Sequence, residues 1–338
     1  MKKHIREFTA FLLAAVLFFT VSWKLGQLLM PVRTVYGSDW EAFLQEEPNS
    51  HDILFFGSSL VYCDVIPAIL WEETGLTSYV MAGPEQTIPT SYYYAKECFR
   101  TQKPRLVVQE VTSMFYPQYT NYSKANVGYM PFGVSRLEAT FAAAESEQRF
   151  GLLFPLYNYH YRWQDVSRGD LLHHLKKPRS LTAGYTLLTD VCPPPYVGDQ
   201  SYTAGSDNYR RNVSYLKKLQ TLCSENGAEL MLYVAPSGGR IPADAMAVLR
   251  QDLAEMGLSL VDFNADWDTM GLHHDTDWYD RLHFNARGAA TFTRHLGRRL
   301  TELYGLTPRE SVSEIWDRRL EHIHTALGSL QAAQSAAS

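Results

Sequence analysis

Cysteine is scarce in this chain, and its few copies follow no metal-ligand spacing. The 338 residues include four cysteines: Cys63, Cys98, Cys192 and Cys223. None of them belongs to a Cys-x-x-Cys pair or to a Cys/His cluster of the kind that binds zinc. We therefore expect free, buried thiols, no bound metal and no cofactor.

The chain also lacks a basic excess, a phosphate-binding loop and internal repeats. Lys and Arg number 31 against 36 Asp and Glu, and the net charge of −5 argues against a nucleic-acid-binding protein. No glycine-rich loop typical of phosphate binding occurs. Hydrophobic residues make up 46% and charged residues 20%, as in folded proteins, and the length suits one large domain or two small ones.

A long apolar run stands near the N-terminus. Residues 8–30 contain FTAFLLAAVLFFTVSW, then Lys24, then LGQLLM, and about 20 apolar residues are enough for a helix to span a bilayer. Lys24 lies close enough to the helix end for its side chain to reach the headgroups. No small-residue cleavage site follows, which favours a retained anchor over a removed signal peptide. A buried core helix is the alternative interpretation.

Basic residues predict the orientation of this helix. They precede the apolar run: Lys2, Lys3 and Arg6. Positively charged flanks stay in the cytoplasm, so everything after Pro31 is expected outside. The prediction is a single-pass cell-membrane protein, with residues 1–31 as cytoplasmic stub and transmembrane anchor and with an extracellular domain.

From residue 51 onward, short apolar runs alternate with amphipathic segments. Strands are expected at residues 52–57, 77–81, 105–111, 229–234 and 258–262. Helices are expected at residues 66–74, 92–101, 209–226 and 288–304. This alternation predicts an α/β fold, a three-layer sandwich whose central parallel sheet is covered by helices on both faces, as in flavodoxin-like proteins.

The remaining segments break this rhythm and are interpreted as additions to the α/β domain. Residues 32–50 form an acidic connector, and residues 51–307 form the domain itself. Residues 116–206, rich in Tyr, Pro and Asn with a helical patch at 136–149, are expected to form an insertion over the carboxyl edge of the sheet. Residues 308–338 are expected to form an amphipathic helix and a tail.

The first candidate for chemistry is the segment FFGSSL at residues 55–60. It places Ser59 in the turn between a strand and a helix, where the hydroxyl lies at the carboxyl edge of the sheet. Backbone N–H groups at the start of a helix can stabilise a tetrahedral oxyanion there. By itself the segment fits a structural turn or a helix cap better than a catalytic site.

The second candidate is WYDRLHFN at residues 278–285, just ahead of the last helix of the domain. Asp280 and His283 are three residues apart, so the carboxylate can hold the Nδ1 side of the imidazole. The Nε2 side then remains free to take a proton from a serine. The alternative is a capping aspartate next to an unrelated surface histidine.

Together the two segments resemble the SGNH (GDSL-like) hydrolase superfamily over about residues 52–303. GSSL matches its first block, with Ser58 in the aspartate position and Ser59 as the nucleophile, and DRLH matches its last block with Asp280 and His283. The chain is most similar to the membrane-anchored branch that serves teichoic acid D-alanylation and alginate-type O-acetylation. Three further segments are similar to that branch: QKPRLVV, NYHYRW and YVAPSG.

The resemblance also assigns an oxyanion hole, in which the family uses a glycine N–H and an asparagine side chain. Gly83 in MAGPEQT matches the glycine and joins the N–H of Ser59. The asparagine is missing from QEVTSMFY, where Gln109 or Thr112 stand as replacements unless the two N–H groups suffice. Removing such a donor can slow catalysis about a hundredfold. The predicted substrate-binding candidates are Gln86, Gln109 and His160, although His160 also fits a buried structural histidine.

The function implied by the resemblance is extracytoplasmic, serine-dependent acyl transfer to or from a cell-wall or exported glycan. Activated acyl donors are cytoplasmic, so a multi-pass membrane acyltransferase is the implied partner. Two alternatives remain open. One is a plain extracellular carbohydrate or lipid esterase, and the other is a non-catalytic glycan-binding assembly subunit.

Overall fold

The fold is built on a central sheet of five parallel strands. The computed structural model describes residues 2–32, 36–116, 120–192, 198–309 and 314–337. The strands are β1 (Ile53–Gly57), β2 (Ser78–Ala82), β3 (Leu106–Glu110), β5 (Glu229–Val234) and β7 (Leu260–Asp262). They lie in the order β2-β1-β3-β5-β7, and every pairing is parallel. The predicted α/β class with a central parallel sheet is therefore confirmed.

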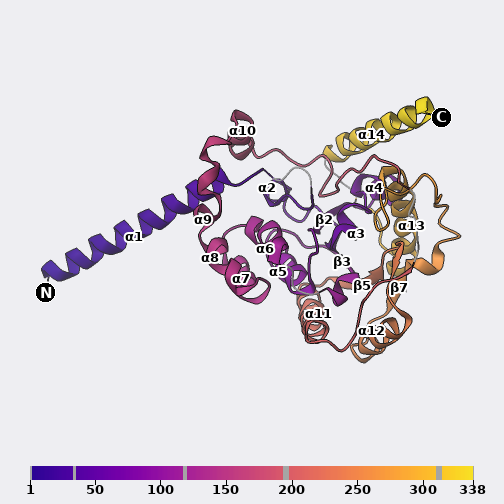
Figure 1. Ribbon diagram of the computed structural model, residues 1–338, viewed down its shortest axis with the longest axis horizontal. Helices are drawn as coiled ribbons and strands as arrows, with labels where there is room; N and C mark the ends of the chain where they lie inside the picture. Colours follow the sequence, from indigo (N-terminus) through magenta and orange to yellow (C-terminus); the bar gives the residue numbers. More distant parts are fainter. Residues whose placement is uncertain (1, 33–35, 117–119, 193–197, 310–313, 338) are drawn as a thin grey trace.

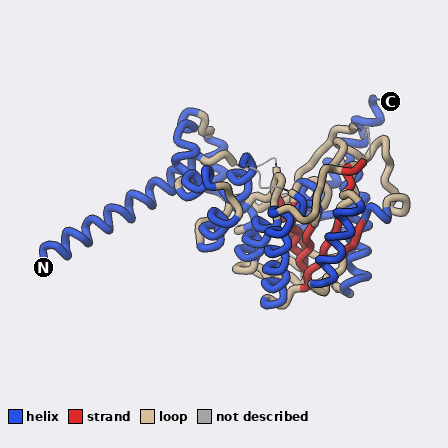
Figure 2. Tube along the Cα trace, turned by 60° about the horizontal axis from the view of Figure 1, so that its bottom comes forward, coloured by secondary structure: helices blue, strands red, loops and turns tan. Residues whose placement is uncertain are grey.

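Helices cover both faces of this sheet because both faces of its strands are apolar (Figures 1 and 2). In β1, Ile53 and Phe55 pack on one side and Leu54 and Phe56 on the other. The first side is covered by α4 (Pro67–Thr74), α13 (Ala286–Tyr304) and α14 (Ile315–Ala337). The second is covered by α5 (Ile88–Cys98), α11 (Asp207–Glu225) and α12 (Ala243–Glu255).

Some boundaries differ from those predicted from the sequence. Helix α5 begins at Ile88, four residues earlier than expected, because Pro89 fits the first turn of a helix, where its missing N–H costs nothing. The helical patch expected at residues 136–149 is two helices, α7 (Val134–Ala142) and α8 (Ser146–Leu153). Helix α12 was not located by the sequence analysis.

The strand order explains where a site can form. The chain runs from β1 to β2 on one side and then crosses to β3 on the other. Loops at such a switch point diverge and leave a crevice at the carboxyl ends of the strands. The turn after β1, which carries Ser59 at the start of α3 (Ser59–Tyr62), lies at this point.

The insertion was expected to lie over the carboxyl edge of the sheet. In the structure, part of it lies beside the sheet instead. It contains α6 (Thr120–Asn126), α7, α8, α9 (Pro155–Tyr159), the 3₁₀ helix η3 (His160–Gln164) and α10 (Arg168–Lys176). Helix α7 packs on α5, and α9 packs along the N-terminal helix α1 (Lys2–Leu29) (Figure 1). The later segment, residues 181–192, first lies beside the open side of the outer strand β2, where Val80 N–H donates to the Ala183 carbonyl. It then reaches the carboxyl edge, where Thr186 N–H donates to the Tyr62 carbonyl.

Two helices extend the α/β domain at its ends. Helix α1 is long and apolar enough to cross a membrane, and its first part projects away from the domain (Figure 1). Helix α14 packs against α4 through its apolar side and continues to Ala337, which leaves no separate tail among the described residues. Between α1 and β1, the connector contains the short helix α2 (Trp40–Phe43).

All four cysteines are free thiols. Cys63, Cys98 and Cys223 are buried as expected, and burial raises the pKa of each thiol, that of Cys223 to about 12. Cys192 is exposed, which corrects the expectation for that residue, because it lies in the segment that crosses the surface of the carboxyl edge.

Candidate active site

The turn from β1 to α3 presents Ser59 at the edge of the sheet. It begins at Gly57, whose φ of 153° favours glycine and where a Cβ would lie 2.5 Å from a methyl group of Val61. The buried Ser58 precedes α3, but its side chain does not cap the helix and instead lies 3.4 Å from the Tyr116 hydroxyl. The N–H of Ser59 therefore stands at the start of a helix, where no acceptor exists within that helix.

A tight loop ahead of α13 holds the histidine. Trp278 and Phe284 pair across it as an antiparallel bridge. Within the loop, Asp280 Oδ1 accepts the backbone N–H groups of Leu282 at 2.7 Å and His283 at 2.9 Å. Asn285 ends the loop and caps α13 by accepting from the N–H groups at its start. The carboxylate and the imidazole are thus fixed on one short segment before they meet the serine.

The structure brings the three predicted residues together. His283 Nε2 lies 2.7 Å from Ser59 Oγ, across 224 positions of sequence. On its other side, His283 Nδ1 lies 2.8 Å from Asp280 Oδ2 and 3.0 Å from Oδ1. The His283 side chain is 18% exposed and the Asp280 side chain 44%, so the group is accessible from solvent. These contacts match the geometry of a Ser-His-Asp relay.

Backbone contacts from two other segments hold the loop against the serine. From the insertion, Cys192 N–H donates to the Trp278 carbonyl at 2.9 Å. Leu188 accepts from Ala286 N–H at 2.7 Å. On the far side, Gly238 N–H donates to the Arg281 carbonyl at 3.1 Å. The insertion therefore contributes to the site as a support for the relay loop, although it adds no member of the relay.

The electrostatics of the relay favour charge on both partners. Burial by itself lowers the pKa of His283, but the hydrogen bond with Asp280 and the nearby carboxyl groups of Asp64, Asp280 and Glu85 outweigh it, so the pKa lies above 6.5. Burial by itself raises the pKa of Asp280, but its bonds to His283 and to the backbone bring it below 3.8. Asp280 is thus ionised and stabilises a protonated imidazole.

Two buried acids beneath the relay were not found by the sequence analysis. Asp64 accepts the N–H of Phe284, the residue after the histidine, at 3.0 Å, and Glu110 at the end of β3 accepts from the Thr112 hydroxyl. Burial raises the pKa of Asp64 to about 8 and that of Glu110 to about 7. Asp280, and not Asp64, contacts His283 Nδ1 and is therefore the acid of the relay. No motif in the sequence marked either residue.

Comparisons with protein-family models and with curated proteins found no relative of this chain. No model of a known protein family matches the chain. No curated protein matches it significantly.

The second predicted oxyanion donor is engaged elsewhere. The Gly83 N–H donates to the Gly57 carbonyl at 3.3 Å. Of the two predicted oxyanion donors, only the Ser59 N–H is therefore available to a substrate in this structure. Gly83 is required for a different reason, because a Cβ there would lie 2.0 Å from Asn126 Oδ1. Asn126, on α6 of the insertion, donates to the Pro84 carbonyl and packs against this loop. Asn126 reaches this loop only through the tertiary fold, and no motif in the sequence around it marked it as part of the site.

The remaining predicted binding residues do not gather around Ser59. Gln86 and Gln109 are fully buried and donate their amides to the main-chain carbonyls of Met81 and Glu110, so they have no surface that a substrate can contact. Thr112 is buried against Glu110. His160 is exposed on η3 beside α1, where its Nδ1 lies 3.0 Å from the Tyr157 carbonyl, so it is neither buried nor next to the relay.

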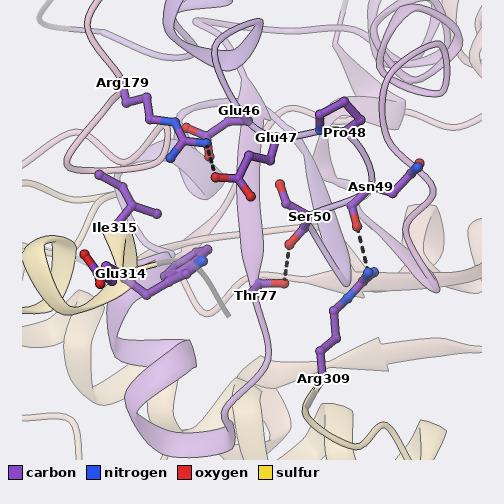
Figure 3. Close-up of a pocket in the computed structure, with 11 residues that line it drawn as sticks. Glu46, Glu47, Pro48, Asn49, Ser50, Thr77, Arg179, Arg309, Glu314 and Ile315 are labelled. Atoms are coloured by element: carbon purple, nitrogen blue, oxygen red, sulfur yellow. Dashed lines mark hydrogen bonds and ion pairs between the residues drawn. The ribbon is translucent and has the colours of Figure 1, made fainter. Parts of the chain in front are cut away.

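A well-formed hollow of about 520 Å³ lies at the amino edge of the sheet, near the starts of β1 and β2 (Figure 3). Both of its arginines are already engaged: Arg179 contacts Glu47 at 3.1 Å, and Arg309 donates to the Asn49 carbonyl at 2.7 Å. The described residues contain no cluster of three or more His, Cys, Asp or Glu side chains suited to a metal ion. The relay at the carboxyl edge is therefore the candidate active site.

Proposed function

We propose that this chain is a membrane-anchored serine acyl-transfer enzyme of the SGNH type, which acts outside the cytoplasm on a cell-wall or exported glycan. The observation that carries the proposal is the continuous contact from Ser59 Oγ through His283 to Asp280 at the carboxyl edge of the sheet. A serine, an imidazole and a carboxylate in this order form the group that activates a hydroxyl as a nucleophile.

The first half of the reaction forms an acyl-enzyme. Ser59 Oγ attacks the carbonyl carbon of an ester or thioester donor while His283 Nε2, 2.7 Å away, accepts the hydroxyl proton. The N–H of Ser59 at the start of α3 stabilises the oxyanion. As the intermediate collapses, the bond to the leaving group breaks, and His283 returns the proton to that group.

The second half transfers the acyl group. A sugar hydroxyl attacks the acyl carbon while His283 takes its proton, and Ser59 leaves with that proton. Water in place of the sugar gives plain ester hydrolysis by the same steps. Asp280 keeps the imidazole oriented in both halves, because it holds Nδ1 at 2.8 Å and is itself fixed by two backbone N–H groups.

The membrane part of the proposal rests on α1. The helix is long and apolar enough to span a bilayer, and basic residues precede its apolar run, which favours a cytoplasmic N-terminus. An active site on the outer side has no direct access to cytoplasmic acyl donors. A multi-pass membrane acyltransferase that delivers the acyl group is therefore part of the proposed function.

Covalent labelling tests the proposed nucleophile. A fluorophosphonate probe is expected to label the folded wild-type protein at Ser59, because the probe reacts with serines activated by a histidine. Ser59→Ala should remove the label. Ser58→Ala is the matched control and should keep it, because Ser58 is buried and contacts Tyr116. Folded wild-type protein that takes up no label would contradict the proposal and favour the non-catalytic assembly subunit.

The pH dependence of ester hydrolysis should follow His283. Its unprotonated form is the base, and its pKa is raised, so kcat/KM should increase with pH through a midpoint above 6.5. Glu85→Gln should move this midpoint down, because the negative charge of Glu85 contributes to raising the pKa of His283. Rates measured across pH for both proteins check this, and a midpoint below 6.5 in the wild type would contradict it.

A further inference from the structure

The insertion packs against the second half of α1, the helix proposed to span the membrane. Phe154, between α8 and α9, contacts Phe19 with ring centroids 5.8 Å apart, and Phe132 contacts Trp23 at 4.6 Å. At Gly26 the helices approach so closely that a Cβ would lie 2.4 Å from the backbone of Leu156. These contacts fix the position of the insertion along the helix axis.

The length of α1 sets the depth of these contacts in a bilayer. At about 1.5 Å per residue, Phe19 lies about 16 Å and Trp23 about 22 Å beyond Phe8, where the apolar run begins. The hydrocarbon core is about 30 Å thick, so both residues lie in its outer half. The 11 residues from Phe8 to Phe18 cover only about 16 Å. If α1 spans the membrane, the half of α1 that contacts the insertion must therefore lie within the bilayer.

The helices of the insertion that pack along α1 carry large exposed apolar side chains. Five of them are exposed by between 48% and 73%: Phe132 and Leu137, which line the cleft beside α1, and Phe141, Phe150 and Tyr157 on α7, α8 and α9. A largely apolar cleft of about 570 Å³ also opens between α1 and the insertion, lined by Phe19, Trp23, Phe132, Leu137 and Phe154. Apolar surface of this extent is unfavourable in water and favourable among acyl chains.

The aromatic residues farther along match the outer boundary of the membrane. Arg162 on η3 donates to the Leu29 carbonyl at 2.8 Å, which places η3 about 31 Å beyond Phe8 by the same rise per residue. Tyr161 and Trp163 on either side of it are 63% and 68% exposed. Tyrosine and tryptophan are the residues that gather where hydrocarbon meets headgroups. Along α1, apolar side chains thus come at the depth of the hydrocarbon core, and the aromatic residues of η3 come at the depth of the headgroups.

We propose that the apolar surface of the insertion, formed by Phe132, Leu137, Phe141, Phe150 and Tyr157, is immersed in the outer leaflet of the membrane. The inference rests on the proposed membrane anchor and goes beyond it. The protein is held by α1 and by a second element, composed of α7, α8 and α9, that enters one leaflet without crossing the bilayer. The occupant of this surface is the acyl-chain layer of the lipids.

Quenching by lipid-borne nitroxides tests the inference in the full-length protein reconstituted into vesicles. Cys192→Ser removes the exposed native thiol, and the other three cysteines are buried. Into this background, Phe132→Cys introduces a site for an environment-sensitive fluorophore, and Phe150→Cys provides a second. Leu13→Cys places the fluorophore on the anchor. Val248→Cys places it on α12 of the α/β domain and is the matched control, because the Val248 side chain is 41% exposed.

Lipids that carry a nitroxide on the acyl chain should quench the fluorophore at positions 132 and 150 about twofold or more, as at position 13, and leave position 248 unquenched. Quenching at 13 without quenching at 132 and 150 would overturn the inference and leave the anchor standing. A lack of quenching at position 13 as well would overturn both the inference and the membrane anchor. Labelling of Ser59 by the fluorophosphonate probe does not depend on either result.

Discussion

Replacing Asp280 with asparagine is expected to lower kcat for hydrolysis of a small chromogenic ester by about 10⁴-fold, with little change in stability. The amide oxygen can still accept the N–H groups of Leu282 and His283, so the loop keeps its shape. The amide nitrogen would then face His283 Nδ1, at the 2.8 Å contact now made by Oδ2. Two donors cannot share that contact, so the ring proton moves to Nε2.

With its proton on Nε2, the imidazole donates to Ser59 Oγ and can no longer accept the serine proton. The matched control is Asp266→Asn, because Asp266 forms another aspartate–histidine contact, 3.1 Å from His295 Nε2, outside the relay. Its kcat should remain that of the wild type. If Asp280→Asn kept wild-type kcat while Ser59→Ala was inactive, Asp280 would not be the acid of the relay.

Replacing Arg319 with alanine is expected to reduce the free energy of unfolding by about 3–5 kcal/mol. Arg319 joins α14 to the domain through an ion pair of 2.6 Å with Glu46, and the two side chains are 0% and 2% exposed. Its Nε donates to the Ser180 carbonyl, and its guanidinium lies over the ring of Trp316. Without Arg319, the Glu46 carboxylate remains buried next to His51 with its charge uncompensated.

Arg318→Ala is the matched control for this prediction. Arg318 is the exposed neighbour on the same helix, and its replacement should change the free energy of unfolding by about 0.5 kcal/mol or less. The double variant Glu46→Leu/Arg319→Met should lose less stability than Arg319→Ala, because no buried charge is left unpaired. Denaturant unfolding in detergent measures all three. Equal losses for Arg318→Ala and Arg319→Ala would show that the pair contributes little.

The parallel sheet could be predicted because its strands are buried on both faces. Runs such as ILFFG in β1 and LVVQE in β3 are apolar at successive positions and end close to glycine, proline or polar residues. Helix boundaries were less accurate where a proline permits two starts, as at Pro89 in α5. The position of the insertion was not predictable, because its helices are amphipathic and could have packed on several surfaces.

The relay could be predicted because each of its halves is local. Ser59 lies in the turn after a buried strand, and Asp280 and His283 share one short loop, so two short segments carry the prediction and their joint resemblance to a known family connected them. The other predicted binding residues depended on where distant segments meet. His160 is in a segment similar to that of the proposed family, yet it lies beside α1, and Gln86 and Gln109 face the interior.

The sequence by itself determined the α/β class and the apolar helix at the N-terminus, because these depend on composition and periodicity, and it indicated the three residues of the relay through two short segments that together resemble a known family. Only the tertiary structure decided the 2.7 Å contact between Ser59 and His283, the engagement of Gly83 with Gly57 and the burial of Asp64 beneath the relay. It also decided that the insertion packs against α1. The physical reason is that such contacts join segments far apart in the chain, and their partners are selected by packing and burial, which no local pattern of residues records.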